Sequence, residues 1–345
     1  MNRSIDPGIL GAGDNGEPVA IAPPDAVVVG SAARDVTAAD RRGWRLGGGV
    51  TYGALTLARL GLRVGAVIGV DEPGSTAAEL DLLREAGADV RLVHLARTPV
   101  FENVETSAGR VQTCVEPGQP LPAEALQDLP PDWQAASTWL LAPVADELPD
   151  AWASVPPPRA TVGLGWQGIL RELGRGLRVT RRPPRPSALV SRADVVGVSH
   201  QDVDPGTEIE SLSHLLHPGA TLLVTEGQRG GWRLTIGDDG PIARRRYPSI
   251  AADREIDPTG AGDVFLAAYL ASGLIPLGGS GRRGSDLRLA AAAASHVIEG
   301  PGLRGVPTLG QVARRLAGSL SRAMEPNPSQ PGSSEPDPSR LEPGA

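Results

Sequence analysis

Short apolar runs alternate with helical patterns along most of this chain. Nearly continuous apolar strands separated by helices indicate a mostly parallel sheet with both faces covered. The sequence therefore predicts an α/β domain of three layers. The runs that predict strands, rich in Val, Leu and Ala, are residues 25–31, 63–70, 89–95, 138–144, 159–165, 193–199 and 220–227.

Helical spacing fills the segments between these runs. Residues 50–61 predict a helix that stops at Gly61. Residues 75–87 predict a second helix, with Ser75 as its N-cap and Gly87 past its end.

Two pieces of the chain break this rhythm. Residues 34–46 and 98–117 alternate polar and apolar side chains, as hairpins do, and the second turns at "SAG". Beside a sheet-based domain, such pieces predict a small β lid. The folded part is expected at 23–322, between disordered segments at 1–22 and at 323–345, where Pro and Ser dominate.

Composition excludes several kinds of chemistry. The chain has no lysine, so its 33 basic residues are all arginine. A Walker A loop, a protein-kinase fold and Schiff-base catalysis all need a lysine amine, and each is excluded in its usual form. The formal net charge of −7 argues against a nucleic-acid partner.

Localisation is predicted from cysteine usage and from the absence of long apolar runs. Cys114 is the single cysteine, which excludes an intrachain disulfide and fits a reducing cytoplasm. The N-terminus lacks the apolar region of a signal peptide, and no run is long enough to span a membrane. We expect a cytoplasmic protein with no membrane partner.

The stretch "EIDPTGAGDVF", residues 255–265, predicts a reactive turn before a helix. Proline at 258 favours an extended Asp257, and Gly260 and Gly262 allow positive φ and close backbone approach. The apolar helix that follows is expected to stop at Gly273, so "GAGD" lies at a helix N-terminus, which attracts anions. Asp263 is then either a helix-capping acid or a general base, and a phosphate cradle beside a base suits attack by a hydroxyl on a phosphoryl group.

"DPTGAGDVF" resembles the C-terminal motif of the PfkB/ribokinase family of ATP-dependent carbohydrate kinases, usually written D-T-x-G-A-G-D. Three further segments resemble motifs of that family in the same order: "VVGSAARD" (28–35), "GGGVTYGALTLARLG" (47–61) and "VTEGQRGG" (224–231). The resemblance covers some 240 residues and implies a ribokinase-like fold. It also implies phosphorylation of a hydroxyl on a small sugar, polyol or nucleoside, with ATP and Mg²⁺.

Site residues are implied by the same motifs. The resemblance assigns Asp263 as the base, with the turn Gly260, Ala261 and Gly262 as the anion hole. It assigns Thr225, Gly227, Gly230, Asp257 and Thr259 to the nucleotide side, and Asp35, Gly47, Gly48 and Tyr52 to the acceptor. From the predicted lid itself, Glu102 and Asn103 are candidates for substrate contact or for a purely structural flap.

Two departures from the family pattern affect these assignments. Tyr52 stands where the family often has an Asn that touches the substrate, so ribose or fructose is not the expected acceptor; Tyr52 is either part of the acceptor site or a core aromatic. "SHQD" (199–202) stands where a Mg²⁺-associated N-x-x-E segment should fall, and Asp202 is the candidate to keep the acid's role through water.

Other interpretations stay open on the sequence alone. A catalytically silent relative that senses sugar or nucleotide is one, and a vitamin or pyrimidine kinase of the same superfamily, which usually lacks the lid, is another. "GAGDNG" (11–16) matches a dinucleotide fingerprint, but the strand and helix that the fingerprint needs do not flank it. The edge of the lid favours a homodimer through the lid.

Overall fold

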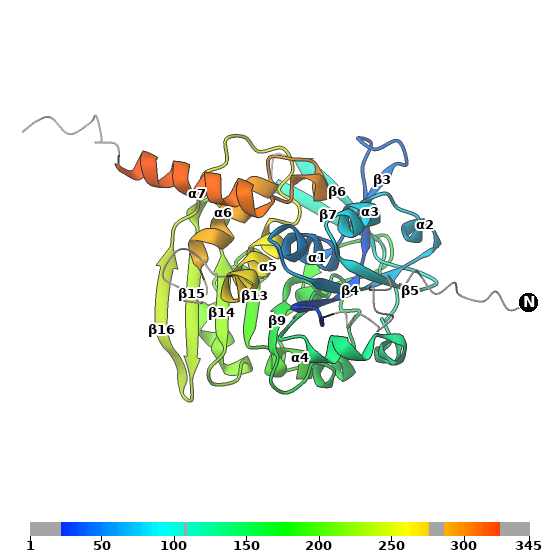
Figure 1. The fold of residues 1–345 in the computed structure, drawn as a ribbon, viewed down its shortest axis with the longest axis horizontal. Coiled ribbons are helices and arrows are strands. Elements are labelled where there is room, and N and C mark those ends of the chain that lie inside the picture. Colours follow the sequence, from blue (N-terminus) through cyan, green and yellow to red (C-terminus); the bar gives the residue numbers. More distant parts are fainter. Residues whose placement is uncertain (1–21, 107–108, 276–285, 325–345) are drawn as a thin grey trace, which may run out of the picture.

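A nine-stranded sheet runs through the computed structural model, which describes residues 22–106, 109–275 and 286–324 (Figure 1). Its order is β16-β15-β14-β13-β9-β8-β1-β4-β5. All neighbours from β14 to β5 pair in parallel, and β15 and β16 add an antiparallel hairpin at one edge. The mostly parallel sheet is therefore confirmed. Its strands are β1 Ala26–Ser31, β4 Val64–Val70, β5 Asp89–His94, β8 Thr138–Leu141, β9 Thr161–Gly165, β13 Val195–Ser199, β14 Thr221–Thr225, β15 Gly231–Gly237 and β16 Gly240–Tyr247.

Side chains of β1 divide between two cores because successive residues of a strand point to opposite faces. Ala26 and Val28 belong to one core cluster, and Val27 and Val29 belong to the other. The first core lies under α-helices that cover one face of the sheet. These helices are α1 Gly49–Arg59, α3 Glu79–Glu85, α5 Ala261–Leu274, α6 Leu287–Val297 and α7 Leu309–Met324.

The second face carries mostly short 3₁₀ turns, where the sequence predicted helices. Prolines keep some of these segments short, because a helix usually ends before the residue that precedes a proline: Pro130 follows η1 and Pro156 follows η3. Tryptophans fill this core, and Trp139, Trp152 and Trp166 have no exposed surface. The elements are η1 Ala123–Asp128, η2 Pro131–Ala135, η3 Asp150–Ser154, η4 Gln167–Leu170, α4 Ala188–Arg192 and η5 Ile209–Leu215.

A separate five-stranded sheet, here called the lid, has the order β11-β7-β6-β2-β3. Two antiparallel hairpins build it, and the parallel pairing of β2 with β6 joins them. The predicted small β lid is confirmed, although the turn at Ser107 and Ala108 lies outside the described residues. The strands are β2 Ala33–Val36, β3 Trp44–Gly47, β6 Val100–Thr106, β7 Gly109–Glu116 and β11 Leu177–Arg178; β10 Arg171–Glu172 and β12 Thr180–Arg181 pair beside it.

Some predicted helix ends are wrong. The single helix at 75–87 is two helices, α2 Glu72–Ser75 and α3, and the cap of α2 is Asp71, whose carboxylate accepts from the Gly74 N–H. Ser75 is the last residue of α2 and caps nothing. Gly273 does not stop α5, which ends one residue later, because a single glycine inside a helix costs only about 1 kcal/mol. Gly61 and Gly87, in contrast, follow their helices with positive φ, as predicted.

The predicted end segments, 1–22 and 323–345, lie mostly outside the described residues. α7 continues to Met324, so the first two residues of the predicted tail are helical. Residues 1–21 and 325–345, which include "GAGDNG", lie outside the described residues. Within the described part of the chain, no helix has the length and apolarity needed to cross a membrane.

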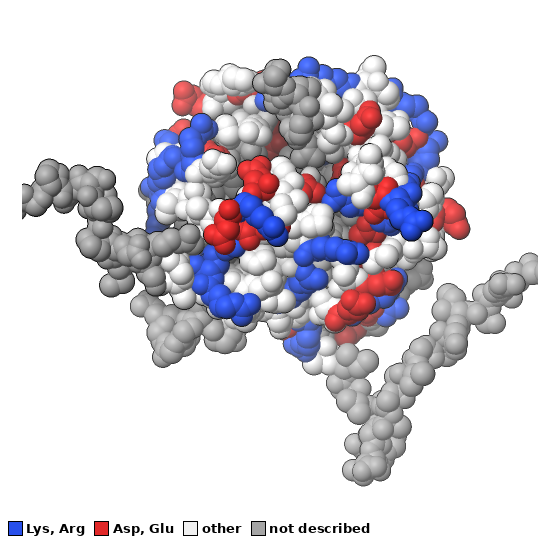
Figure 2. All heavy atoms as spheres, turned by 90° about the horizontal axis from the view of Figure 1, so that it is seen from above, with Lys and Arg blue, Asp and Glu red and all other residues white. Residues whose placement is uncertain are grey.

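Charge is mixed on the face shown in Figure 2, where arginine and acidic side chains are interspersed among the described residues. The lid also exposes apolar side chains, with Val104 at 49% the most exposed on β6. A homodimer through the lid stays a prediction.

Candidate functional site

The glycine-rich turn leads into α5. Gly260 is the N-cap and has a left-handed φ of 81°, and Ala261 and Gly262 are the first helical residues. Amides at the start of a helix have no partner within it. Outside the helix, the Ala261 N–H makes a long bond to the Pro258 carbonyl (3.3 Å), and the Gly260 and Gly262 N–H groups make no such bond to the described residues. A Cβ added to the exposed Gly262 would meet nothing within 4 Å, so the space beside the turn is open to a ligand.

Asp263 lies in the first turn of α5, as predicted. Its side chain keeps some contact with solvent, yet the surrounding protein withdraws it from water, and this desolvation raises its pKa from 3.8 to about 6. Asp202 and Asp35 raise the pKa further, while Arg171 lowers it. A carboxyl with a pKa near neutrality is suited to accept a proton in catalysis.

Three consecutive glycines bring two carboxylates to the same backbone segment. A Cβ on Gly47 would lie 2.7 Å from an oxygen of Asp35, and a Cβ on Gly49 would lie 2.8 Å from an oxygen of Asp263. Gly48 has a φ of 96° and a Cβ there would meet the backbone of β1, at Ser31. Two residues span at most about 7 Å, so Asp35 and Asp263 flank opposite ends of a short segment. Gly47 and Gly48 were predicted site residues, and Gly49, which was not, is the one that faces Asp263.

Tyr52 packs beneath the reactive turn. Only 2% of its surface is exposed, and a Cβ on Gly260 would lie 2.4 Å from its ring. Burial raises the pKa of its hydroxyl, and Asp35, Asp257 and Asp263 raise it further. Tyr52 thus packs against the turn, and its ring leaves no room for a side chain at position 260.

A row of polar side chains continues from Asp35 across the lid. The Asn103 amide donates to Asp35 (3.3 Å), and the Gln112 amide donates to Asn103 (2.8 Å). Alternation along β6 turns Glu102 to the opposite face of the lid. The structure therefore joins Asn103 to Asp35 and adds Gln112, whose position in a hairpin gave no sequence signal.

Arg171 is a cation that sequence reasoning missed. Its guanidinium lies 5.4 Å from the centre of the Phe101 ring, on the lid, and donates to the Val144 carbonyl (3.1 Å). Among the charged groups near Asp263, Arg171 has the largest effect on the pKa of that carboxyl, which it lowers. Arg171 lies in a short strand after a 3₁₀ turn, and the sequence around it carries no motif.

Asp257 connects the turn to two other parts of the chain. One carboxylate oxygen accepts from the Thr259 N–H (3.0 Å). The other accepts from the Gly302 N–H (3.1 Å), in η7 Gly302–Gly305, and from Arg45 on β3 (3.3 Å). Thr259 is therefore held beside Asp257, and Arg45 binds the same carboxylate.

Asp202 lies in the loop that follows the carboxyl end of β13. One carboxylate oxygen accepts from the Ser199 N–H and the other from the Gln167 amide, both at 2.9 Å. In the register of the sheet Ser199 pairs with Thr225, the last residue of β14. Among the described residues, no group of three or more His, Cys, Asp or Glu side chains is arranged to hold a metal. Asp202 alone therefore cannot form a complete protein metal site. It fits only an ion whose other ligands are mainly water and phosphate oxygens.

The turn after β14 contains the two predicted nucleotide-side glycines. Gly227 begins η6 Gly227–Arg229 and has a φ of 58°, with open space where a Cβ would lie. Gly230 has a φ of 84°, and a Cβ there would meet the backbone carbonyl of Tyr247 at 2.1 Å. Gly227 thus faces free space, while Gly230 permits close packing against β16.

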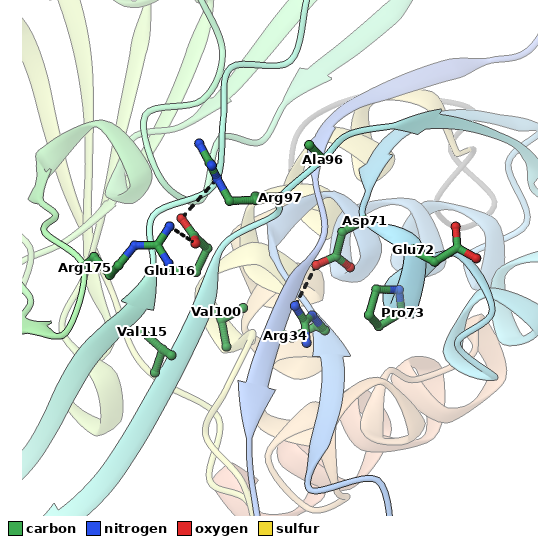
Figure 3. Close-up of a pocket in the computed structure, with 10 residues that line it drawn as sticks. All are labelled: Arg34, Asp71, Glu72, Pro73, Ala96, Arg97, Val100, Val115, Glu116 and Arg175. Atoms are coloured by element: carbon green, nitrogen blue, oxygen red, sulfur yellow. Dashed lines mark hydrogen bonds and ion pairs between the residues drawn. The ribbon is translucent and has the colours of Figure 1, made fainter.

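A cavity of about 410 Å³ lies on the other side of the lid (Figure 3). Arg34, next to Asp35 on β2, points into it and pairs with Asp71 at 2.7 Å. Glu116 pairs there with Arg97 and Arg175. None of the predicted site residues lines this cavity. The remaining lining residues are Glu72, Pro73, Ala96, Val100 and Val115.

Comparison with known proteins identifies the fold. No protein-family model matches the chain. A solved structure described as a pyrophosphate-dependent kinase of the ribokinase family, complexed with a pyrophosphate analog and myo-inositol, matches with 18% identity and a TM-score of 0.63, over 84% of this chain and 99% of that one. The nucleoside kinase of Methanocaldococcus jannaschii matches with 18% identity and a TM-score of 0.60, over 86% and 99%. The ribokinase of Arabidopsis thaliana, complexed with ribose and ATP, matches with 20% identity and a TM-score of 0.57, over 86% and 99%. The resemblance found in the sequence is confirmed at the level of the fold.

Proposed function

We propose that this chain, which has the ribokinase fold, is a kinase that phosphorylates a hydroxyl of a small sugar, polyol or nucleoside. The single observation that carries the proposal is the placement of Asp263. It is a carboxylate with a raised pKa, in the first turn of a helix whose N-terminal glycine turn faces open space. This arrangement combines a base with an anion site, which is what in-line phosphoryl transfer to a hydroxyl needs.

In this proposal Asp263 accepts the proton of the acceptor hydroxyl as the oxygen attacks the phosphoryl group. The N–H groups of Gly260, Ala261 and Gly262 stabilise the charge on the transferred group, helped by the helix dipole. Because this site holds phosphate with backbone amides, the absence of lysine is no obstacle.

On the donor side we propose ATP, with Thr225, Gly227, Gly230, Asp257 and Thr259 near its phosphates. Mg²⁺ would neutralise those phosphates when bound, with Asp202 reaching it through water. One of the similar structures is described as pyrophosphate-dependent, so pyrophosphate is the second donor to test.

On the acceptor side we propose Asp35, Asn103 and the backbone of Gly47 and Gly48. The chain of amides from Gln112 to Asp35 fixes the orientation of the carboxylate, which can then accept from two hydroxyls of a polyol. Tyr52, buried under the turn, shapes the floor of this site.

Two of the alternative functions predict different structures. A vitamin or pyrimidine kinase usually lacks a β lid, and the five-stranded lid counts against that alternative. A third alternative, a Rossmann dehydrogenase, depends on the dinucleotide fingerprint match of "GAGDNG", which lies outside the described residues. A catalytically silent relative shares the fold and is separated from an active kinase only by assay.

A thermal-shift screen of sugars, polyols and nucleosides, each with a non-hydrolysable ATP analogue or with pyrophosphate, would identify ligands. Turnover of each hit would then be measured for the natural protein and for Asp263→Asn. Asp204→Asn, at an exposed acid in the segment after β13, is the matched control. We expect turnover that Asp263→Asn abolishes and Asp204→Asn leaves intact. Binding of donor and acceptor without turnover by the natural protein would favour the silent relative instead.

A further inference from the structure

Three arginines tie the β2–β3 hairpin of the lid to the rest of the protein. Two of them bind acids near α2 and α3, and the Arg34 contact is visible in Figure 3. Only the third reaches the reactive turn. The pairs are Arg34 with Asp71 (2.7 Å), Arg42 with Glu79 (2.6 Å) and Arg45 with Asp257 (3.3 Å).

Asp257, the partner of Arg45, holds the residues that lead into the reactive turn. Asp257 accepts from the Thr259 N–H with one oxygen, which fixes the residue immediately before Gly260. With its other oxygen it accepts from Gly302 and from Arg45. The Asp257 side chain is 19% exposed and that of Arg45 is 26% exposed, so solvent screens this pair only partly.

Arg45 and Asp35 lie directly opposite each other in the β2–β3 hairpin. Residues in this position share one face of a sheet. The same hairpin therefore carries the carboxylate proposed to bind the acceptor and the cation that binds Asp257. Any movement of the hairpin relative to α5 moves both groups together.

The charge of Arg45 matters because carboxylates gather at the turn. Asp35, Asp257 and Asp263 all lie close enough to the Tyr52 hydroxyl to raise its pKa, and Arg45 is close enough to lower it. Without Arg45, the Asp257 carboxylate would lose the arginine that pairs with it and would place its negative charge beside the site that must accept phosphate. At short range in a partly buried site, such repulsion is strong.

We infer that Arg45 is a positioning residue that couples the position of the β2–β3 hairpin to the geometry and charge of the phosphoryl-binding turn. The coupling itself is a property of the unliganded protein. Its consequence for phosphoryl transfer depends on the proposed function.

Hydrogen exchange of the full-length protein without ligand tests the coupling. Arg45→Ala should speed amide exchange in a peptide covering residues 255–265, because Asp257 loses one of the groups that fix it. Arg45→Lys should keep most of the protection. Arg42→Ala is the matched control, since it removes a tie of the same hairpin without touching the turn. Equal exchange in Arg45→Ala and the natural protein, or equal acceleration in Arg42→Ala, would overturn the inference.

Kinetics with an identified acceptor test the consequence. Arg45→Ala should lower kcat by roughly 10- to 100-fold, with a smaller change in the KM of the acceptor, as expected for a misplaced reactive group. Guanidinium ion at a non-denaturing concentration should restore part of kcat in Arg45→Ala and none in Asp263→Asn. A raised acceptor KM with unchanged kcat would make Arg45 an acceptor contact and refute the positioning role. If the natural protein phosphorylates nothing, the proposed function fails, while hydrogen exchange still decides the coupling.

Discussion

At the scale of single residues, the environment of Asp263 decides what its carboxyl can do. Gly49 leaves room for one of its oxygens, protein atoms withdraw it from water, and Arg171 limits the resulting rise in pKa. The same carboxyl at an exposed helix start would have an ordinary pKa and would only complement the helix dipole.

Asp263→Asn should therefore stabilise the protein while greatly reducing its activity. The pKa of Asp263 is raised from 3.8 to about 6 on folding, so its contribution to stability is fully present below pH 3.8 and is lost as the pH rises through about 6. At pH 8 the asparagine variant should gain about 1–3 kcal/mol in the free energy of unfolding, and kcat should fall by roughly 10²- to 10⁴-fold. Urea unfolding at pH 5 and pH 8 checks the gain, which should be smaller at pH 5. A loss of stability at pH 8 would contradict it.

Arg171 should influence the pH at which activity falls on the acid side of the pH–rate profile. If Asp263 is the base, as proposed, its deprotonated form is the active one, and kcat/KM should rise with pH through about 6. Arg171 lowers the pKa of Asp263, so Arg171→Ala should move this limb to higher pH, and Arg171→Lys should move it less. Profiles of the natural protein, both variants and the exposed-site control Arg178→Ala would show it. An unmoved limb in Arg171→Ala would mean that Arg171 does not act on the base.

Gly49→Ala should damage catalysis without damaging the fold. Its Cβ would lie 2.8 Å from an Asp263 oxygen, so the carboxylate must shift, and a shift of this kind costs roughly 10- to 100-fold in kcat. Alanine is otherwise favourable at the start of α1. Steady-state kinetics and thermal unfolding check both parts. Gly318→Ala, where a Cβ meets nothing within 4 Å, should retain full activity.

At the scale of elements, the reactive turn and α1 are fitted to each other through Tyr52 and Gly260. Gly260→Ala should destabilise the protein for two reasons, a positive φ that costs about 1–2 kcal/mol and a clash with the Tyr52 ring. Tyr52→Ala removes only the clash, so the double variant should be less destabilised than the sum of the two single variants, by about 1–3 kcal/mol. Urea unfolding of all four proteins measures this coupling. Strict additivity would show that the ring does not restrict residue 260.

Element types were predicted better than element ends. The apolar runs gave the parallel strands, and alternation gave both lid hairpins, because each pattern reports which face of a strand is buried. The divided helix at 72–85 and the 3₁₀ turns of the second face were missed. Local capping by Asp71 and the spacing of prolines decide these features, and apolar periodicity does not record them.

At the scale of the whole molecule, the lid lies against the nine-stranded sheet and its two cores, here called the body. Trp44 is placed to report the position of the lid relative to the body. Trp44 lies on β3, and its ring centre is 4.5 Å from the Arg42 guanidinium and 5.5 Å from that of Arg34. If ligand binding seats the hairpin, adding acceptor and a non-hydrolysable ATP analogue together should change the tryptophan emission. Because Trp232 on β15 is also partly exposed, the test is made in a Trp232→Phe background: there Trp44→Phe should remove the change, since Trp133, Trp139, Trp152 and Trp166 are buried in the body. The same change in Trp44→Phe would place the response in the body.

The sequence by itself determined the layers of this protein, its lid and the turn that carries Asp263. Strand and helix periods, the order of the motifs and the position of glycines are local properties of the chain, and each is visible in the residues themselves. Only the tertiary structure decided what surrounds that turn. Arg45 and Arg171 lie 212 and 92 positions before their partners, Asp257 and Asp263. Such contacts depend on how the lid and the sheet edge come together, and no local pattern encodes that packing.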